Sequence, residues 1–260
     1  MKKISKYSAG LFSKLLENLS EYEMAADQET LHRIRITLKK IRSLFILLSF
    51  CDLKFNYRKQ FHPFKKIYKE AGSIRSIFIT RKLSVEYGIE LKKKRKDLIP
   101  DNNKAESIPG FINEIRRTEN FVYKKYFEIL KHFEKINEDC YRKYNSNRKK
   151  ELKNLVFPYV IESKLHNARK ICKEITFLNE LNNSRKINTD LYFEELQDLI
   201  GNWHDKIEFR NTLENGSPDI SSESTGKIDK EIVSDLRKIK KLTADHYKNK
   251  NRSGNHPANL

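Results

Sequence analysis

Apolar residues recur at helical spacing along most of the chain, and short polar stretches separate these runs. The stretch LHRIRITLKKIRSLFILL, which begins at Leu31, has an apolar residue every three or four positions, as is typical of an amphipathic α-helix. Asp27 stands where an N-cap residue would begin that helix. We expect Gly72 and Gly201 to end or interrupt helices, because glycine is a weak helix former. The spacing predicts helices over about residues 4–23, 28–50, 63–72, 73–94, 111–145, 159–181, 190–200, 202–213 and 228–248.

Residues suited to tight turns are scarce. The chain has 8 glycines and 6 prolines among 260 residues, too few for the many turns of an all-β fold, so the sequence predicts an all-α protein. The clearest internal break is the polar stretch DLIPDNNKAESIPG, residues 97–110, which we expect to link two helical halves of about 1–96 and 111–250. Further breaks are expected around residues 145–158 and 214–227, and a disordered tail at residues 251–260.

Four basic side chains share one side of the helix predicted after Asp27. An α-helix turns about 100° per residue, and by this geometry the four fall within one arc of roughly 80° that borders the apolar face. They are His32, Arg35, Lys39 and Arg42, which we call the first basic seam. Arg33 and Lys40 point elsewhere, where a solvated face is expected.

A second stretch repeats this arrangement. The segment LHNARKICKEITFLNELN, which begins at Leu165, again has an arginine three residues and a lysine seven residues after a histidine. Its basic residues, His166, Arg169 and Lys173, form the second basic seam. Downstream of the first seam, Arg75 follows Gly72 by three residues, and downstream of the second, His204 follows Gly201 by three. The duplicated order indicates two related helical halves.

Cations at the margin of an apolar core are costly to bury unless anions compensate them. Two such seams, one from each half, could therefore face each other across a groove or pore and bind a polyanion. The alternative is that these Lys and Arg residues bury only their stems and keep their heads in water. The recurrence of the spacing favours binding. The predicted binding residues are His32, Arg35, Lys39, Arg42, His166, Arg169 and Lys173, with Arg75, His204 and Lys69 completing the set.

The overall charge points to the same class of partner. The chain carries 53 basic and 35 acidic residues, a formal net charge of +18. Such a surplus favours a polyanion: nucleic acid, an anionic membrane surface or a phosphate polymer. A lysine-rich chain with ordinary solvated faces is the alternative.

The cysteines and the hydrophobic runs bear on the compartment. The chain has three cysteines, Cys51, Cys140 and Cys172, which lie far apart and form no CxxC pair. We therefore expect neither a disulfide nor a zinc site, and we expect a cytoplasmic location. Charged residues interrupt the first apolar stretch, which favours an amphipathic helix over a signal peptide. No run approaches the roughly 20 apolar residues of a membrane span, so no membrane partner is expected.

At these residues the sequence resembles the CHAD family, the conserved histidine α-helical domain. The resemblance lies in the two basic seams and in the elements Gly72-x-x-Arg75 and Gly201-x-x-His204-Asp205 that follow them. It spans about residues 5–250, and it implies one CHAD domain, residues 1–250, made of two pseudo-symmetric four-helix bundles around a basic central pore. The family binds inorganic polyphosphate without catalysis or cofactor, and some members localise to polyphosphate granules.

The chain departs from the family pattern at two positions. Where the family has an aspartate after the first Gly-x-x-Arg, this chain has Ser76, and where it often has an arginine ten residues after the second histidine, this chain has Thr176. An acidic partner is therefore absent from the first half, and the second seam is one charge shorter. Family members are often joined to a triphosphate-handling domain marked by Glu-x-Glu-x-Lys, which the sequence lacks.

Two other classes of function remain as alternatives. A nucleic-acid-binding protein fits the charge, but the sequence has no RNP-like strand, zinc finger or helix-turn-helix, and few aromatics accompany the seams. A phosphate-handling enzyme could use His204-Asp205, but this dipeptide alone is a weak signal and its surroundings match the CHAD pattern better. A di-iron bundle could use Glu29-x-x-His32, but it needs a second such pair, and none occurs. We therefore expect no enzyme, no metal and no cofactor. A scaffold protein that docks through its basic segment 227–252 is a further alternative.

Overall fold

The structure is a computed structural model that describes residues 2–89, 111–180, 188–214 and 222–253. The elements described are helices, which confirms the all-α class. The predicted linker, residues 97–110, lies outside the described residues, as do residues 254–260 of the predicted tail. The helices in chain order are α1 (Lys2–Ala25), α2 (Gln28–Cys51), α3 (Tyr57–Phe61), η1 (His62–Phe64), α4 (Lys65–Glu86), α6 (Phe111–Phe133), α7 (Glu138–Val156), α8 (Glu162–Asn179), α9 (Asn188–Glu214) and α10 (Ser222–Ser253).

The chain divides into two compact units. Unit 1 comprises Met1–Ser84 and Leu91–Tyr144, and unit 2 comprises Val85–Glu90 and Asn145–Leu260. Among the described residues, no helix is both long enough and apolar enough to cross a membrane.

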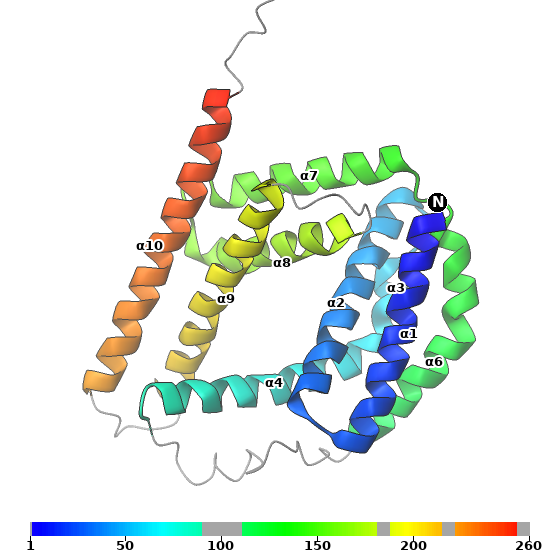
Figure 1. The fold of residues 1–260 in the computed structure, drawn as a ribbon, viewed down its shortest axis with the longest axis horizontal. Coiled ribbons are helices and arrows are strands. Elements are labelled where there is room, and N and C mark those ends of the chain that lie inside the picture. Colours follow the sequence, from blue (N-terminus) through cyan, green and yellow to red (C-terminus); the bar gives the residue numbers. More distant parts are fainter. Residues whose placement is uncertain (1, 90–110, 181–187, 215–221, 254–260) are drawn as a thin grey trace, which may run out of the picture. The chain divides into compact units, whose positions relative to one another are not determined.

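Unit 1 is built on the antiparallel pair α1 and α2. Figure 1 shows α1 beside α2 and α6, and these are the helices that it contacts. The interface between α1 and α2 is apolar, and it contains the fully buried residues Leu15, Leu19, Leu31 and Leu38. An aromatic cluster closes one side, with the rings of Phe12, Phe45 and Phe64 centred 6.3–6.5 Å apart. Burial of side chains of this size contributes about 1.5–3 kcal/mol each, so this core holds the helices of unit 1 together.

The turn between α1 and α2 starts the second helix. Ala26 has a positive φ of 47°, and Asp27 then accepts a hydrogen bond from the backbone N–H of Thr30 at 2.9 Å. Asp27 is thus the N-cap that the sequence predicts, a cap worth about 0.5–2 kcal/mol. It fixes where α2 begins, and so which residues of α2 face α1.

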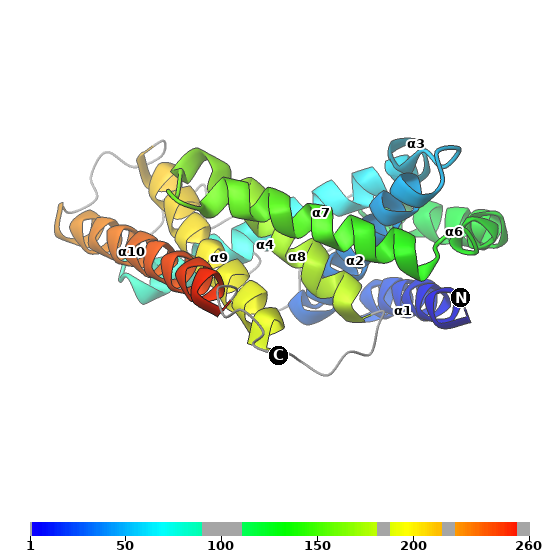
Figure 2. The ribbon, with the colours of Figure 1, turned by 90° about the horizontal axis from the view of Figure 1, so that it is seen from above.

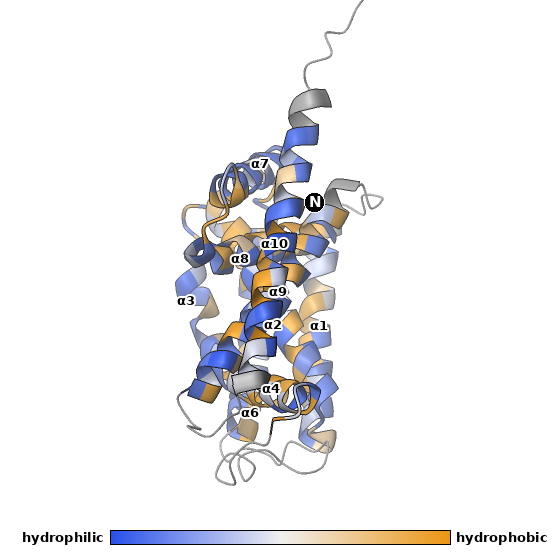
Figure 3. Ribbon diagram, turned by 90° about the vertical axis from the view of Figure 1, so that its left-hand side faces the viewer, coloured by the Kyte–Doolittle hydropathy of each residue, from blue (hydrophilic) through white to orange (hydrophobic). Residues whose placement is uncertain are grey.

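Unit 2 is built on α9, which lies between α8 and α10. Figures 1 and 2 both show this order, and α9 contacts both neighbours. Its core joins Leu165, Ile175, Leu196, Ile200 and Ile239, all nearly or fully buried. Hydrophobic and hydrophilic residues alternate along the ribbon of α9, as they do along α1 (Figure 3). Each of these helices therefore has an apolar side to bury and a polar side to present.

Ion pairs join α9 to α10 on the other side from α8. The Lys206 ammonium lies 2.8 Å from a carboxylate oxygen of Asp235 and 3.0 Å from one of Glu231, and Arg210 lies 3.1 Å from Asp229. The Asp235 side chain is only 7% exposed, so it must be paired to be buried. These pairs fix how α10 sits along α9.

Four predicted helix boundaries differ from those of the structure. The helix α4 runs without a break through Gly72, and α9 runs without a break through Gly201. A glycine costs a helix only about 1 kcal/mol, and tertiary packing exceeds that here. The break expected around residues 145–158 comes later, because α7 continues to Val156 and α8 begins at Glu162. Likewise, α10 begins at Ser222, inside the loop predicted over residues 214–227.

The expectation of no disulfide is also wrong. Cys51, the last residue of α2, is bonded to Cys140 in the first turn of α7, with the two Cα atoms 5.9 Å apart. Spacing along the sequence hid this pair, since 89 positions separate the two residues. Cys172 is free and buried. Because disulfides are rare in a reducing cytoplasm, the cysteines no longer argue for that location.

We predict that the disulfide is a major source of stability for unit 1. Replacing Cys51 with Ser should lower the free energy of unfolding by about 2–5 kcal/mol, because the bond closes a long loop of the unfolded chain. Cys140→Ser and the double variant should lose the same amount, since each change removes the same link. Urea unfolding of the three variants and the wild type measures this.

Thiol counting provides an independent check. The denatured protein should react with a thiol reagent at one cysteine without reductant and at three after reduction, as read by mass spectrometry. Three reactive thiols before reduction would contradict the bond.

Candidate functional site

In unit 1, an arginine of α2 lies on a glycine of α4. A β-carbon added at Gly72 would come within 2.6 Å of Nη1 of Arg35, so the guanidinium occupies the space that any other residue would need. That same nitrogen donates a hydrogen bond to the backbone carbonyl of Tyr68 at 2.9 Å, and the guanidinium lies 5.1 Å from the centre of the Tyr68 ring. The Arg35 side chain is therefore held in place at the junction of the two helices.

Two further basic residues, His32 and Arg75, interact electrostatically beside Arg35. Burial lowers the pKa of His32, and the charge of Arg75 lowers it further, with smaller contributions from Lys39 and Arg35 and an opposing one from Glu29. Burial also lowers the pKa of Arg35, to which Arg75 again contributes. We call His32, Arg35 and Arg75 the α2–α4 cluster. Its members lie close enough to raise one another's cost of being charged.

Unit 2 contains the equivalent arrangement. A β-carbon added at Gly201 of α9 would come within 2.6 Å of Nη2 of Arg169 on α8. One helical turn from each of these residues, the rings of His166 and His204 are centred 5.2 Å apart. We call His166, Arg169 and His204 the α8–α9 cluster. The repeat seen in the sequence therefore corresponds to a repeated geometry, in which His and Arg come from one helix and Gly and a basic residue from the next.

Electrostatics in the α8–α9 cluster resemble those in unit 1. Burial lowers the pKa of His166, followed by the positive charge of Lys170 and by His204 and Arg169, while Glu208 acts in the opposite direction. His166 is nevertheless exposed enough for its ring to meet a ligand from solvent. Lys170 was not among the predicted residues. Its position four residues after His166 was the signal that could have identified it.

The structure brings only part of each predicted seam together. The charge of Lys39 helps to lower the pKa of His32. Lys173 is half-buried on α8. Arg42 is half-buried further along α2, and no described contact links it to the cluster. Lys69 is exposed, and its described hydrogen bond uses only its backbone carbonyl, which accepts from Ser73. Tyr68 was missed, and its place four residues before Gly72 was the available signal.

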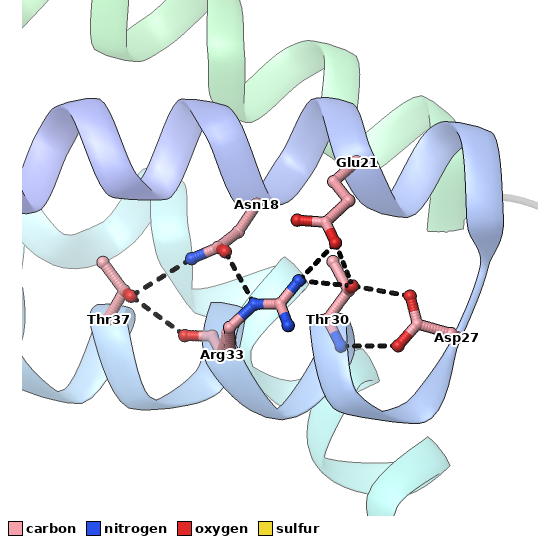
Figure 4. A network of polar contacts seen from close by, with 6 residues as sticks. All are labelled: Asn18, Glu21, Asp27, Thr30, Arg33 and Thr37. Carbon is pink, nitrogen blue, oxygen red and sulfur yellow. Dashed lines mark hydrogen bonds and ion pairs between the residues drawn. The ribbon is translucent and has the colours of Figure 1, made fainter.

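The expectation that Arg33 is a solvent charge holds only in part, because its side chain is 38% exposed but forms an ion pair with α1. Its guanidinium pairs with Glu21 of α1 and donates to the Thr30 hydroxyl at 2.8 Å and to the side-chain oxygen of Asn18 at 3.2 Å (Figure 4). The helical angle placed Arg33 correctly away from the apolar face, but α1 packs there with polar residues of its own. Arg33 is thus a structural residue that ties α1 to α2.

Several polar atoms of the two clusters lack a protein partner. Nδ1 of His32 and Nε of Arg169 are buried and make no hydrogen bond within the described residues. Unlike Arg33, the guanidinium groups of Arg35, Arg75 and Arg169 form no ion pair with any described carboxylate. Buried donors without an acceptor cost about 1–3 kcal/mol each, and an anion with several oxygens would satisfy them.

The described residues hold no group of three or more His, Cys, Asp or Glu side chains placed to bind a metal ion. The side chains of the two clusters are of the kind that can recognise an anion. Each offers a guanidinium held in place, an imidazole and a second basic side chain, which suits the tetrahedral oxygens of phosphate.

We predict that alanine substitution changes the free energy of unfolding differently at Gly72 and Gly201, which lie beside arginines, than at glycines elsewhere in the helices. Gly10 in α1 and Gly226 in α10 have nothing within 4 Å of an added β-carbon, so alanine there should stabilise the protein by about 0.5–1 kcal/mol. Gly72→Ala and Gly201→Ala should gain less than this or destabilise, because Arg35 or Arg169 must move. Urea unfolding of the four variants measures the difference, and four equal gains would contradict the contact.

Comparison with known proteins adds no relative on which to base a function. No family model matches the chain, and neither a curated protein nor a solved structure is significantly similar to it.

Proposed function

We propose that the chain binds inorganic polyphosphate without catalysing a reaction. In this proposal the protein is a member of the CHAD family, its two units are pseudo-symmetric bundles, and the phosphate chain occupies a basic channel or groove. The α2–α4 cluster and the α8–α9 cluster contact phosphate groups, with Lys39 and Lys173 next along the same helices. Where polyphosphate granules form, the protein would be found with them.

The observation that supports this most strongly is the repeated pairing of an arginine with a glycine. The guanidinium groups of Arg35 and Arg169 each occupy the space where a neighbouring helix lacks a β-carbon, and neither is paired with a described carboxylate. On the same helix α2, by contrast, Arg33 is paired with Glu21 of α1. Two clusters whose arginines have no described ion pair suggest that an external anion completes them.

Polyphosphate suits these clusters for a chemical reason. It carries closely spaced negative charges and no bases, so it can be recognised by cations alone. Guanidinium groups bind phosphate oxygens in a bidentate manner, and neutralising several phosphates releases their counterions. A nucleic acid would in addition stack its bases on exposed aromatics. In the α2–α4 cluster, the aromatic residue, Tyr68, already packs against Arg35.

We predict that losing the two held arginines weakens binding specifically. The double variant Arg35→Gln and Arg169→Gln should bind long-chain polyphosphate at least about tenfold more weakly, because each change removes a charge-assisted hydrogen bond. Titration calorimetry at physiological salt measures this. Far-UV circular dichroism and thermal unfolding of the same sample show that the variant is folded.

The matched control removes two charges from elsewhere. Lys82 on α4 and Arg237 on α10 are exposed and form no ion pair with described residues, so Lys82→Gln with Arg237→Gln changes the net charge equally. We expect this control to bind nearly as well as the wild type. Equal losses in both double variants would mean that diffuse charge is responsible. Single-stranded DNA of similar total charge should bind much more weakly at the same salt; equal affinity would favour nucleic acid instead.

A further inference from the structure

The two clusters differ at one corresponding position. Three residues after the glycine, α4 carries Arg75 whereas α9 carries His204. Arginine keeps its charge at every pH at which the protein is folded, while a histidine side chain changes its charge near neutral pH. The α2–α4 cluster therefore has two permanent cations and one histidine, and the α8–α9 cluster has one permanent cation and two histidines.

The two histidines of unit 2 are close enough to affect each other. The rings of His166 and His204 are centred 5.2 Å apart and tilted by 57°, so two protonated rings would repel. The Arg169 guanidinium lies on Gly201, one turn before His204, and adds a permanent positive charge. Without an anion the cluster resists gaining protons. An anion that contacts both rings removes that resistance.

The charges around the pair are mostly positive. On α8, Arg169 and Lys170 act against the charged form of His166, and on α9 the carboxylate of Glu208 favours it. Asp205 follows His204 on α9, about 100° further round the helix.

The neighbouring helices contribute little charge to the pair. From α10, Asp229, Glu231 and Asp235 are engaged with Lys206 and Arg210, which lie on the opposite side of α9 from Gly201 and His204. From α7, Arg148 is engaged with Glu174 at 2.9 Å. The carboxylate that acts on His166 is thus Glu208, and Lys170 and Arg169 of α8 act against it.

We propose that the α8–α9 cluster is a pH-dependent phosphate site that binds tightly only when its two histidines are protonated, with His204 as the residue that sets this dependence. The α2–α4 cluster, with Arg75 at that position, binds phosphate across the neutral range. This inference rests on the proposed binding of polyphosphate. It makes the two units unequal partners for one chain of phosphates.

The sign of the effect follows from linkage. Burial and neighbouring cations lower the pKa of His166 in the free protein, and a bound anion raises it. Between these two pKa values, binding takes up protons, so affinity rises as pH falls. The interior phosphates of a long chain are strongly acidic and keep their charge over this range. The change in affinity therefore reports the protein and not the ligand.

The test places arginine at position 204 and histidine at position 75, in two separate variants. Calorimetry with long-chain polyphosphate between pH 8 and pH 5.5 should show wild-type affinity rising on the order of tenfold as pH falls. In His204→Arg, affinity at pH 8 should rise and the change with pH should shrink. In Arg75→His, affinity at pH 8 should fall and the change with pH should grow. Titrations in two buffers of different ionisation enthalpy should show fewer protons taken up by His204→Arg than by the wild type.

The outcomes separate the inference from the proposed function. Binding with the same pH dependence and proton uptake in the wild type and His204→Arg would overturn the inference and leave polyphosphate binding intact. Absence of wild-type binding even at pH 5.5 would overturn both. His62 on η1 is exposed and outside both clusters, so His62→Gln is a control that should leave the pH dependence unchanged.

Discussion

The contact between an arginine side chain and a glycine of the next helix determines the geometry of both clusters. Arg35 on Gly72 and Arg169 on Gly201 each occupy the position that a β-carbon of any other residue would take. The contact sets how closely the two helices approach, and it places the histidine one turn earlier on the arginine helix beside the basic residue one turn later on the glycine helix. Where Arg35 donates to the Tyr68 carbonyl, that nitrogen is satisfied and the rest of the guanidinium remains available.

The same helix α2 shows what a structural cation looks like. Arg33 and Arg35 are two residues apart and point to different sides of the helix. Arg33 meets Glu21, Asn18 and Thr30, which satisfy its charge and its donors, whereas Arg35 meets a carbonyl, an aromatic ring and another cation. The two residues have the same chemistry and similar positions in sequence. Their neighbours make the difference: Arg33 meets polar residues of α1 and forms an ion pair within the protein, whereas Arg35 meets α4 and remains suited to an external anion.

This contrast explains which features of the fold and of the two clusters could be predicted from the sequence. Periodicity predicted the helices, and the spacing from His32 to Arg35 and from His166 to Arg169 placed each pair on one side of its helix. Gly72 and Gly201 were interpreted as breaks, because propensity treats a glycine as a loss and cannot see an arginine that needs the space. Arg33 was interpreted as solvated, because its partners lie on another helix. The pairing of Cys51 with Cys140 was missed for the same reason, since distance along the chain says little about distance in space.

The bond between Cys51 and Cys140 also turns a long part of the chain into a covalent ring. The ring contains α3, η1, α4 and α6, and with them Gly72 and Arg75. A single cut of the backbone anywhere between Asp52 and Asp139 would leave both products joined through sulfur. Under oxidising conditions a protease acting in this part of the chain would nick the protein without dividing it, and the helix that carries Arg35 would remain covalently attached to the helices beyond the cut.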